Sequence, residues 1–199
     1  MTVRSGEIYN VFGGSCGGHY GGACYEHVGD WESCKLYPES NEADWWDLGL
    51  GVTQYGTSHV YVEGGRIGEI FAGGVYANLD VGAGNRAVEM VLTGGTFGGD
   101  ELRVFGGGER GIVNGDIYVR MEGSAKIESR LVGGSNAGTV NGNIVLDLIS
   151  GEAFRVDAAG LGWYIVDEWS GDVYYAPAYI KGDVQVNLYS GFKLGKPRN

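Results

Sequence analysis

An internal repeat constrains this chain more than any other feature of its sequence. Five segments share one template: a strand of alternating apolar and polar residues, a pair of small residues, and a second short strand. The segments are HVYVEGGRI (59–67), VEMVLTGGTF (88–97), IYVRMEGSAKI (117–127), IVLDLISGEAF (144–154) and VQVNLYSGFKL (184–194). They align on Val62, Leu92, Met121, Leu148 and Leu188. The spacings, 30, 29, 27 and 40 residues, are typical of architectures in which repeats stack on one another.

Alternation within each strand predicts which face is buried, because side chains two residues apart point the same way. One face is aliphatic in all five copies: Val60 and Val62; Val88, Met90 and Leu92; Ile117, Val119 and Met121; Ile144, Leu146 and Leu148; Val184, Val186 and Leu188. The opposite face is mostly polar and holds Tyr61, Glu89, Val91, Tyr118, Arg120, Val145, Asp147, Gln185 and Asn187. We therefore expect equivalent aliphatic residues to stack along a common interior, with Leu92, Met121 and Leu148 in one column of a parallel sheet.

Glycine-containing corners repeat in register with these strands. The triplets Asn114-Gly115-Asp116, Asn141-Gly142-Asn143 and Lys181-Gly182-Asp183 each precede a strand. A repeat of 27 to 30 residues has room for three short strands and three corners. The sequence thus predicts an all-β fold, a right-handed parallel β-helix (β-solenoid) of about five rungs. A sandwich of hairpins is the competing architecture, but it would show turn signals every 8 to 12 residues.

Composition and charge narrow the alternatives. The chain has 39 glycines and 3 prolines in 199 residues, which disfavours helices, and the glycines lack the three-residue period of collagen. The hydrophobic share of 43% argues against disorder. A formal charge of −11 argues against nucleic acid and anionic membranes as partners, and no apolar run is long enough for direct membrane insertion.

The sequence predicts one domain over residues 1–199. Residues 6–14 align without gaps on 99–107, which places residue 1 inside a repeat, and neither end carries the polar cap that stacked repeats require. We therefore expect the chain to be part of a longer array.

The repeat resembles a known family at the motifs GGTF, VFGGG and NGNI, found here in VLTGGTFGGDELRVFGGG and TVNGNIVLDLISG. It is similar to the glycine-rich β-helix repeats of large bacterial surface adhesins and autotransporter passenger regions. The resemblance covers residues 58–160 and 181–194 and, more faintly, 6–14. It implies a rigid scaffold at the bacterial cell surface or outside the cell, and specifies architecture more than activity.

Two insertions, residues 15–57 and 161–180, interrupt the repeat and hold all five tryptophans. Acidic and aromatic loops on a rigid scaffold are frequent sites of function, and flat rings beside carboxylates suit sugar recognition. The candidate ligand-binding residues are Trp163, Tyr164, Trp169, Trp45 and Trp46. The alternative is that these aromatic residues only pack against the side of the β-helix.

The acids of the second insertion allow an enzymatic alternative. Asp167, Glu168 and Asp172 are candidates for the carboxylate pair of a polysaccharide-active β-helix enzyme, a glycoside hydrolase or lyase. Acids are frequent in this chain, however, so a pair within reach is expected by chance, and solvated loop residues are the favoured explanation.

Cysteine and histidine residues cluster in the first insertion. Cys16, His19, Cys24, His27 and Cys34 follow the spacing C-x2-H-x4-C-x2-H-x6-C. The sequence leaves three states open: one disulfide with a spare thiol, free thiols, or a zinc site.

Two further motifs lack the context that their chemistry needs. Gly106, Gly108 and Gly111 spell G-x-G-x-x-G, but a strand follows instead of a helix, which argues against dinucleotide binding. The stretch 95–100 has only part of a calcium-binding turn and does not recur at nine residues. His59, at a strand start, is interpreted as structural.

The sequence and the resemblance together favour a non-enzymatic segment of an extracellular adhesin or surface structure. We expect it to need no cofactor. The expected partners are a host or microbial surface glycan or protein and neighbouring repeats of the same polypeptide.

Overall fold

The computed structural model describes residues 1–15, 53–75, 77–99, 103–166 and 173–195. Within these ranges the fold is all-β, and every strand pair except one is parallel. No helix among the described residues is long and apolar enough to cross a membrane.

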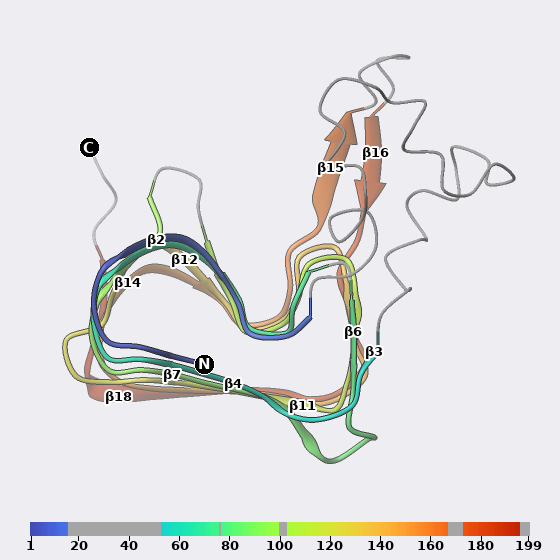
Figure 1. Cartoon of the computed structure of the whole chain (residues 1–199), viewed down its shortest axis with the longest axis horizontal. Helices are drawn as coiled ribbons and strands as arrows, with labels where there is room; N and C mark the ends of the chain where they lie inside the picture. The colour runs from blue at the N-terminus through green and yellow to red at the C-terminus, as the bar shows by residue number, and fades with distance from the viewer. Residues whose placement is uncertain (16–52, 76, 100–102, 167–172, 196–199) are drawn as a thin grey trace, which may run out of the picture.

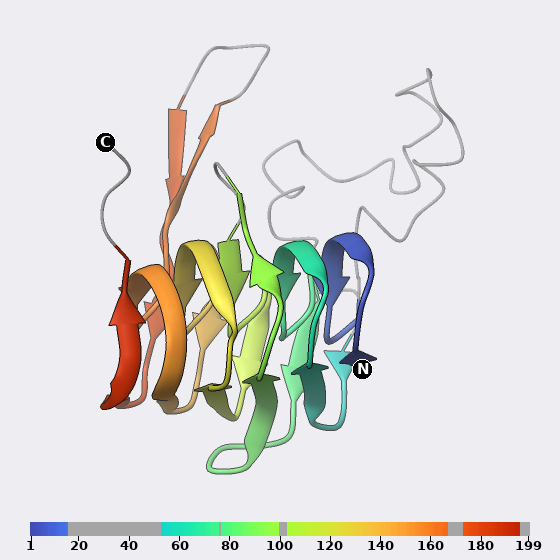
Figure 2. The same ribbon diagram turned by 90° about the vertical axis from the view of Figure 1, so that its left-hand side faces the viewer.

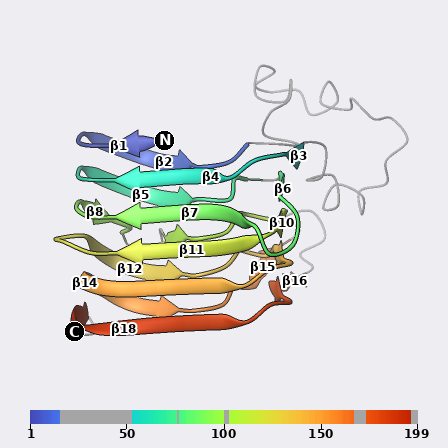
Figure 3. The ribbon, with the colours of Figure 1, turned by 90° about the horizontal axis from the view of Figure 1, so that it is seen from below.

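The first set of parallel strands contains the repeated alternating segments. Its members, in spatial order, are β1 (Thr2–Val3), β4 (Ser58–Val62), β7 (Arg86–Leu92), β11 (Asp116–Met121), β14 (Ile144–Asp157) and β18 (Val184–Leu194) (Figure 3). The register pairs Val62 with Leu92, Leu92 with Met121, Met121 with Leu148, and Leu148 with Leu188. The column predicted from the sequence alignment is therefore confirmed.

Two further sets of parallel strands complete each repeat. The second set contains β2 (Glu7–Phe12), β5 (Arg66–Phe71), β8 (Thr96–Phe97), β9 (Arg103–Phe105), β12 (Lys126–Val132) and the second half of β14. The third contains β3 (Thr53–Gln54), β6 (Asn78–Asp80), β10 (Ile112–Asn114), β13 (Thr139–Val140) and β17 (Tyr179–Ile180). Successive passes of the chain superpose in Figure 1 and lie side by side in chain order in Figure 2.

The aliphatic face of the first strand set forms the main core. Its residues in the first four copies are at most 1% exposed. The fifth copy differs, because Val184, Val186 and Leu188 are 40%, 42% and 61% exposed. Within the described residues β18 pairs only with β14, so nothing covers the other side of these side chains.

A second apolar cluster lies on the other side of the second strand set. Val11, Ile70, Val104 and Leu131 point into the main core, and the residue after each one packs in this cluster. The cluster contains Phe12, Phe71, Phe105, Val132, Val75 and Leu161. The rings of Phe71 and Phe105 are stacked, with centroids 4.9 Å apart and planes 4° apart. The end of the second strand set that contains Phe71 and Phe105 is therefore buried on both faces.

The predicted corners are linked by a ladder of side chains. The Asp116 carboxylate accepts a hydrogen bond of 2.7 Å from the backbone N–H of Asn143 in the next repeat. The Asn143 side chain in turn accepts one of 2.9 Å from the N–H of Asp183. Each corner side chain thus binds the backbone of the following repeat and helps to fix the register.

The second insertion contains the one antiparallel pair among the described strands. β15 (Trp163–Val166) pairs with β16 (Val173–Ala176), and the hairpin projects away from the parallel sets (Figure 1). Most of the first insertion lies outside the described residues.

Truncating two side chains of one column, one buried and one exposed, tests which residues of the column are buried. Met121→Ala removes a fully buried side chain and should lower the free energy of unfolding by about 2–5 kcal/mol. Leu188→Ala, in the same column but 61% exposed, should change it by less than about 0.5 kcal/mol. Urea denaturation measures the free energy of unfolding of both variants. An equal decrease in the two would contradict the exposure of the column at β18.

Candidate functional site

The outward side chains of the first strand set form one continuous surface, which we call the polar face. It consists of two columns in parallel register. One column is His59, Glu89, Tyr118, Val145 and Gln185, and the other is Tyr61, Val91, Arg120, Asp147 and Asn187. Parallel strands lie about 4.8 Å apart, so successive residues of one column are close enough for their side chains to contact each other.

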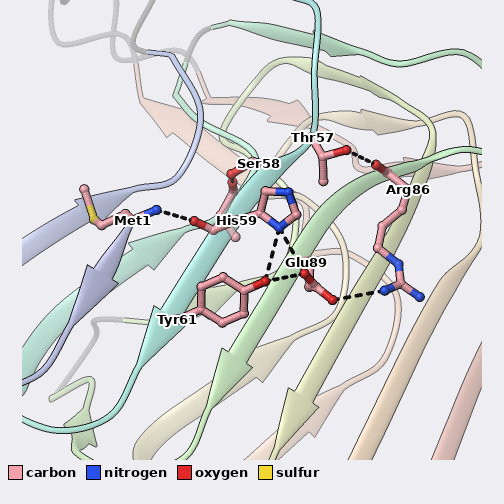
Figure 4. Close-up of polar contacts among 8 residues, drawn as sticks. Met1, Thr57, Ser58, His59, Tyr61, Arg86 and Glu89 are labelled. Carbon is pink, nitrogen blue, oxygen red and sulfur yellow. Dashed lines mark hydrogen bonds and ion pairs between the residues drawn. The ribbon is translucent and has the colours of Figure 1, made fainter.

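At one end of the polar face, three side chains converge on the carboxylate of Glu89 (Figure 4). The Tyr61 hydroxyl donates a hydrogen bond of 2.5 Å to Oε2, and His59 Nδ1 lies 2.9 Å from the same oxygen. Arg86 Nη1 lies 3.1 Å from Oε1. The hydrogen bond from Tyr61 lowers the pKa of Glu89, and the same bond is the main cause of the raised pKa of Tyr61. Glu89 is therefore held as a fixed, ionised acceptor.

A second tyrosine–carboxylate pair lies two strands further along. The Tyr118 hydroxyl donates a hydrogen bond of 2.7 Å to Asp147, and the Asn187 amide donates another of 2.7 Å to the other carboxylate oxygen. The guanidinium of Arg86 lies 4.5 Å from the centre of the Tyr118 ring, a cation–π contact. Burial, followed by the bond to Asp147, raises the pKa of Tyr118. The polar contacts thus join side chains on all five strands from β4 to β18.

His59, which stands at a strand start and is interpreted from the sequence as structural, is part of this network. Its ring also stacks against Tyr61, with centroids 6.0 Å apart. The signal that would have linked these residues is the 30-residue repeat spacing, since it sets Glu89 beside His59 on the next strand.

The outward side of the second strand set carries a column of arginines. Arg103 pairs in register with Arg130, and Arg130 with Arg155. Asp157 lies 2.7 Å from Arg155 and 3.9 Å from Arg130, and its side chain is 15% exposed. Acidic side chains thus lie beside these arginines, with Asp157 next to Arg130 and Arg155.

Glu69, on β5, has a strongly raised pKa. Burial and, to a smaller extent, the negative charge of Glu109 raise its pKa to about 7, while a backbone hydrogen bond and the positive charge of Arg103 act in the opposite direction. Burial also raises the pKa of Glu109. Glu69 can therefore take up or release a proton close to neutral pH.

Most residues predicted as sites from the sequence lie outside the described residues. The backbones of Trp163 and Tyr164 belong to β15. The residues outside are Trp45, Trp46, Trp169, Asp167, Glu168, Asp172, Cys16, His19, Cys24, His27 and Cys34. Within the described ranges, no group of three or more His, Cys, Asp or Glu side chains is arranged to hold a metal ion.

Comparison with known proteins found no similar family, sequence or structure. No protein-family model matches the chain, and no curated protein or solved structure matches it. The resemblance to adhesin repeats stays a prediction from sequence motifs, and any functional conclusion rests on the residues of this chain.

The raised pKa of Glu69 predicts a pH dependence of stability. A carboxyl group with a higher pKa in the folded state binds more protons when folded, so its contribution is lost as pH rises. Because Glu69 is only half-buried, solvent screening reduces the effect, and between about pH 4.5 and pH 7 this group should lower the free energy of unfolding by about 1–2 kcal/mol. Glu69→Gln should flatten that slope and stabilise the protein at pH 8.

Urea denaturation across this pH range is the measurement. Glu63→Gln, at a carboxylate whose side chain is 50% exposed, is the matched control and should keep the wild-type slope. An unchanged slope in Glu69→Gln would show that Glu69 is not the group responsible.

Proposed function

We propose that this chain is a non-enzymatic segment of an extracellular bacterial adhesin or surface structure, built as a right-handed parallel β-helix. In this proposal the β-helix is a rigid stalk, and its outward surfaces contact a glycan. The aromatic residues of the insertions, Trp163 and Tyr164 among them, contribute a second contact surface.

The strand pairing supports the β-helix part of the proposal. Each of the three parallel sets takes its strands from successive repeats, and the chain passes through the sets in turn. A β-helix has this connectivity. Cross-repeat pairing of this kind makes a stiff rod, because every repeat is hydrogen-bonded to its neighbours along three strands.

The polar face is the observation that carries the glycan part of the proposal. Tyrosine rings and carboxylates alternate along it, and their mutual hydrogen bonds fix them before any ligand arrives. Preorganised groups lose little conformational entropy on binding. A polysaccharide also repeats its hydroxyl groups along its length, so a surface with a short, regular repeat fits an extended chain.

Glu69 favours a second candidate function, a polysaccharide-cleaving enzyme. A general acid needs a carboxyl group that is still protonated near neutral pH, and burial supplies that condition here. Glu109 and Arg103 beside it provide a second carboxyl group and a cation. In this alternative Glu69 donates the proton to the leaving oxygen.

A glycan array with the purified chain tests the binding proposal. Tyr61→Ala and Tyr118→Ala should each weaken binding to any hit about tenfold or more, because each removes a ring from the polar face. Trp163→Ala tests whether the second insertion contributes to binding. Tyr9→Ala, at a tyrosine on β2 that is 71% exposed, is the matched control and should bind as the wild type does.

Two results would count against this proposal. Binding that survives both tyrosine substitutions would exclude the polar face as the contact surface, and an absence of any hit would contradict glycan recognition. Release of reducing sugar by the wild type but not by Glu69→Gln would instead establish the enzymatic alternative.

A further inference from the structure

The end of the structure at β18 presents an apolar, uncharged strand edge. β18 is 11 residues long, and no charged residue occurs from Val184 to Phe192. Val186, Leu188 and Leu194 are 42%, 61% and 60% exposed. Folded proteins usually protect such an edge with a charge, a proline or a covering segment. Among the described residues none of these is present over this stretch.

The opposite end of the structure continues the same columns. The register pairs Thr2 with Tyr61 and Val3 with Val62, so the column that ends at Leu188 begins at Val3. By the same relation the column of Asn187 begins at Thr2. Within the described residues β1 pairs only with β4, and β2 only with β5, which leaves one backbone edge of each strand unpaired.

Charge is complementary between the two ends. One column of the second strand set contains, in order, Glu7, Arg66, Thr96, Lys126, Glu152 and Lys193. No two like charges are neighbours in this column. Glu7 and Lys193, at its two ends, are exposed and form no ion pair with other described residues. Lys193 set beside Glu7 would continue the alternation.

We propose that a second copy of this chain binds at the β18 end, with its β1 and β2 in parallel register on β18. The contact places Val3 of the second copy over Leu188, Thr2 over Asn187 and Glu7 over Lys193. It covers the exposed apolar side chains and provides hydrogen-bond partners for the unpaired backbone N–H and C=O groups of β18. Because the two surfaces differ, each copy keeps one open end, and the assembly grows head to tail.

This inference is independent of glycan binding, since only Thr2 and Asn187 among its residues belong to the polar face, and the glycan-binding test changes neither of them. A symmetric pairing of two β18 strands is the competing arrangement. It would leave Glu7 and Lys193 unmatched and would stop at a dimer.

Sedimentation velocity of the 199-residue chain over a concentration series tests the proposal. The wild type should form species larger than a dimer as concentration rises. Lys193→Glu and Glu7→Lys should each shift assembly to higher concentration, about tenfold or more, because each sets like charges side by side. The double variant restores opposite charges and should assemble as the wild type does.

Lys181→Glu is the matched control. It makes the same change in net charge at the same end, but no residue of the second copy lies opposite it, so assembly should be unchanged. Leu188→Lys should abolish assembly while thermal unfolding shows a folded protein, since this side chain is already 61% exposed. A wild type that stays monomeric, a limiting dimer, or a double variant without rescue would each overturn the proposal.

Discussion

In-register parallel hydrogen bonding between successive repeats is the constraint on which the rest of this structure depends. It sets each side chain beside its equivalent in the next repeat, so one aliphatic position per strand builds a whole column of the core. The close approach of successive repeats also restricts which residues can occupy the corners. A Cβ at Gly106 would collide with the carbonyl oxygen of Gly133, and a Cβ at Gly133 with that of Ala158. The corner glycines are therefore a consequence of repeat-on-repeat packing.

The same register organises the outer surface. Groups that are 27 to 30 residues apart in the sequence become neighbours, which is how Tyr61 reaches Glu89 and Tyr118 reaches Asp147. These contacts are exposed or partly buried, so their effect on stability is small. Their effect on order is larger, because Tyr61, Tyr118 and Asn187 are each held by a partner on a neighbouring strand. The polar face is thus ordered by contacts between its own side chains without being part of the core.

Much of the fold could be predicted from the sequence, because strand alternation and repeat spacing together specify both the buried face and the register. The pairing of Leu92 with Met121 and of Met121 with Leu148 follows directly from the alignment. Other features depend on contacts between residues that are far apart in the sequence. Phe71 and Phe105 point away from the main core yet are buried, because a second cluster covers them. The pKa of Glu69 depends on burial and on Glu109, which lies forty residues away in the chain. Whether a strand's aliphatic side chains are buried also depends on a neighbouring strand on each side, which the strand's own sequence does not show. This is why Val184, Val186 and Leu188 are exposed although they match the buried pattern.

Disulfide cross-linking across one strand pair tests the central claim of parallel register most directly. In a background with Cys16, Cys24 and Cys34 replaced by serine, Val91→Cys and Arg120→Cys occupy paired positions on the outward side of β7 and β11. Paired strand positions lie within the distance that a disulfide spans. Mild oxidation should therefore give an intramolecular bond, seen by intact mass as the loss of two hydrogens. Val91→Cys with Val119→Cys, shifted by one residue to the buried side, should give none. Cross-linking of the shifted pair but not of the paired one would contradict the register.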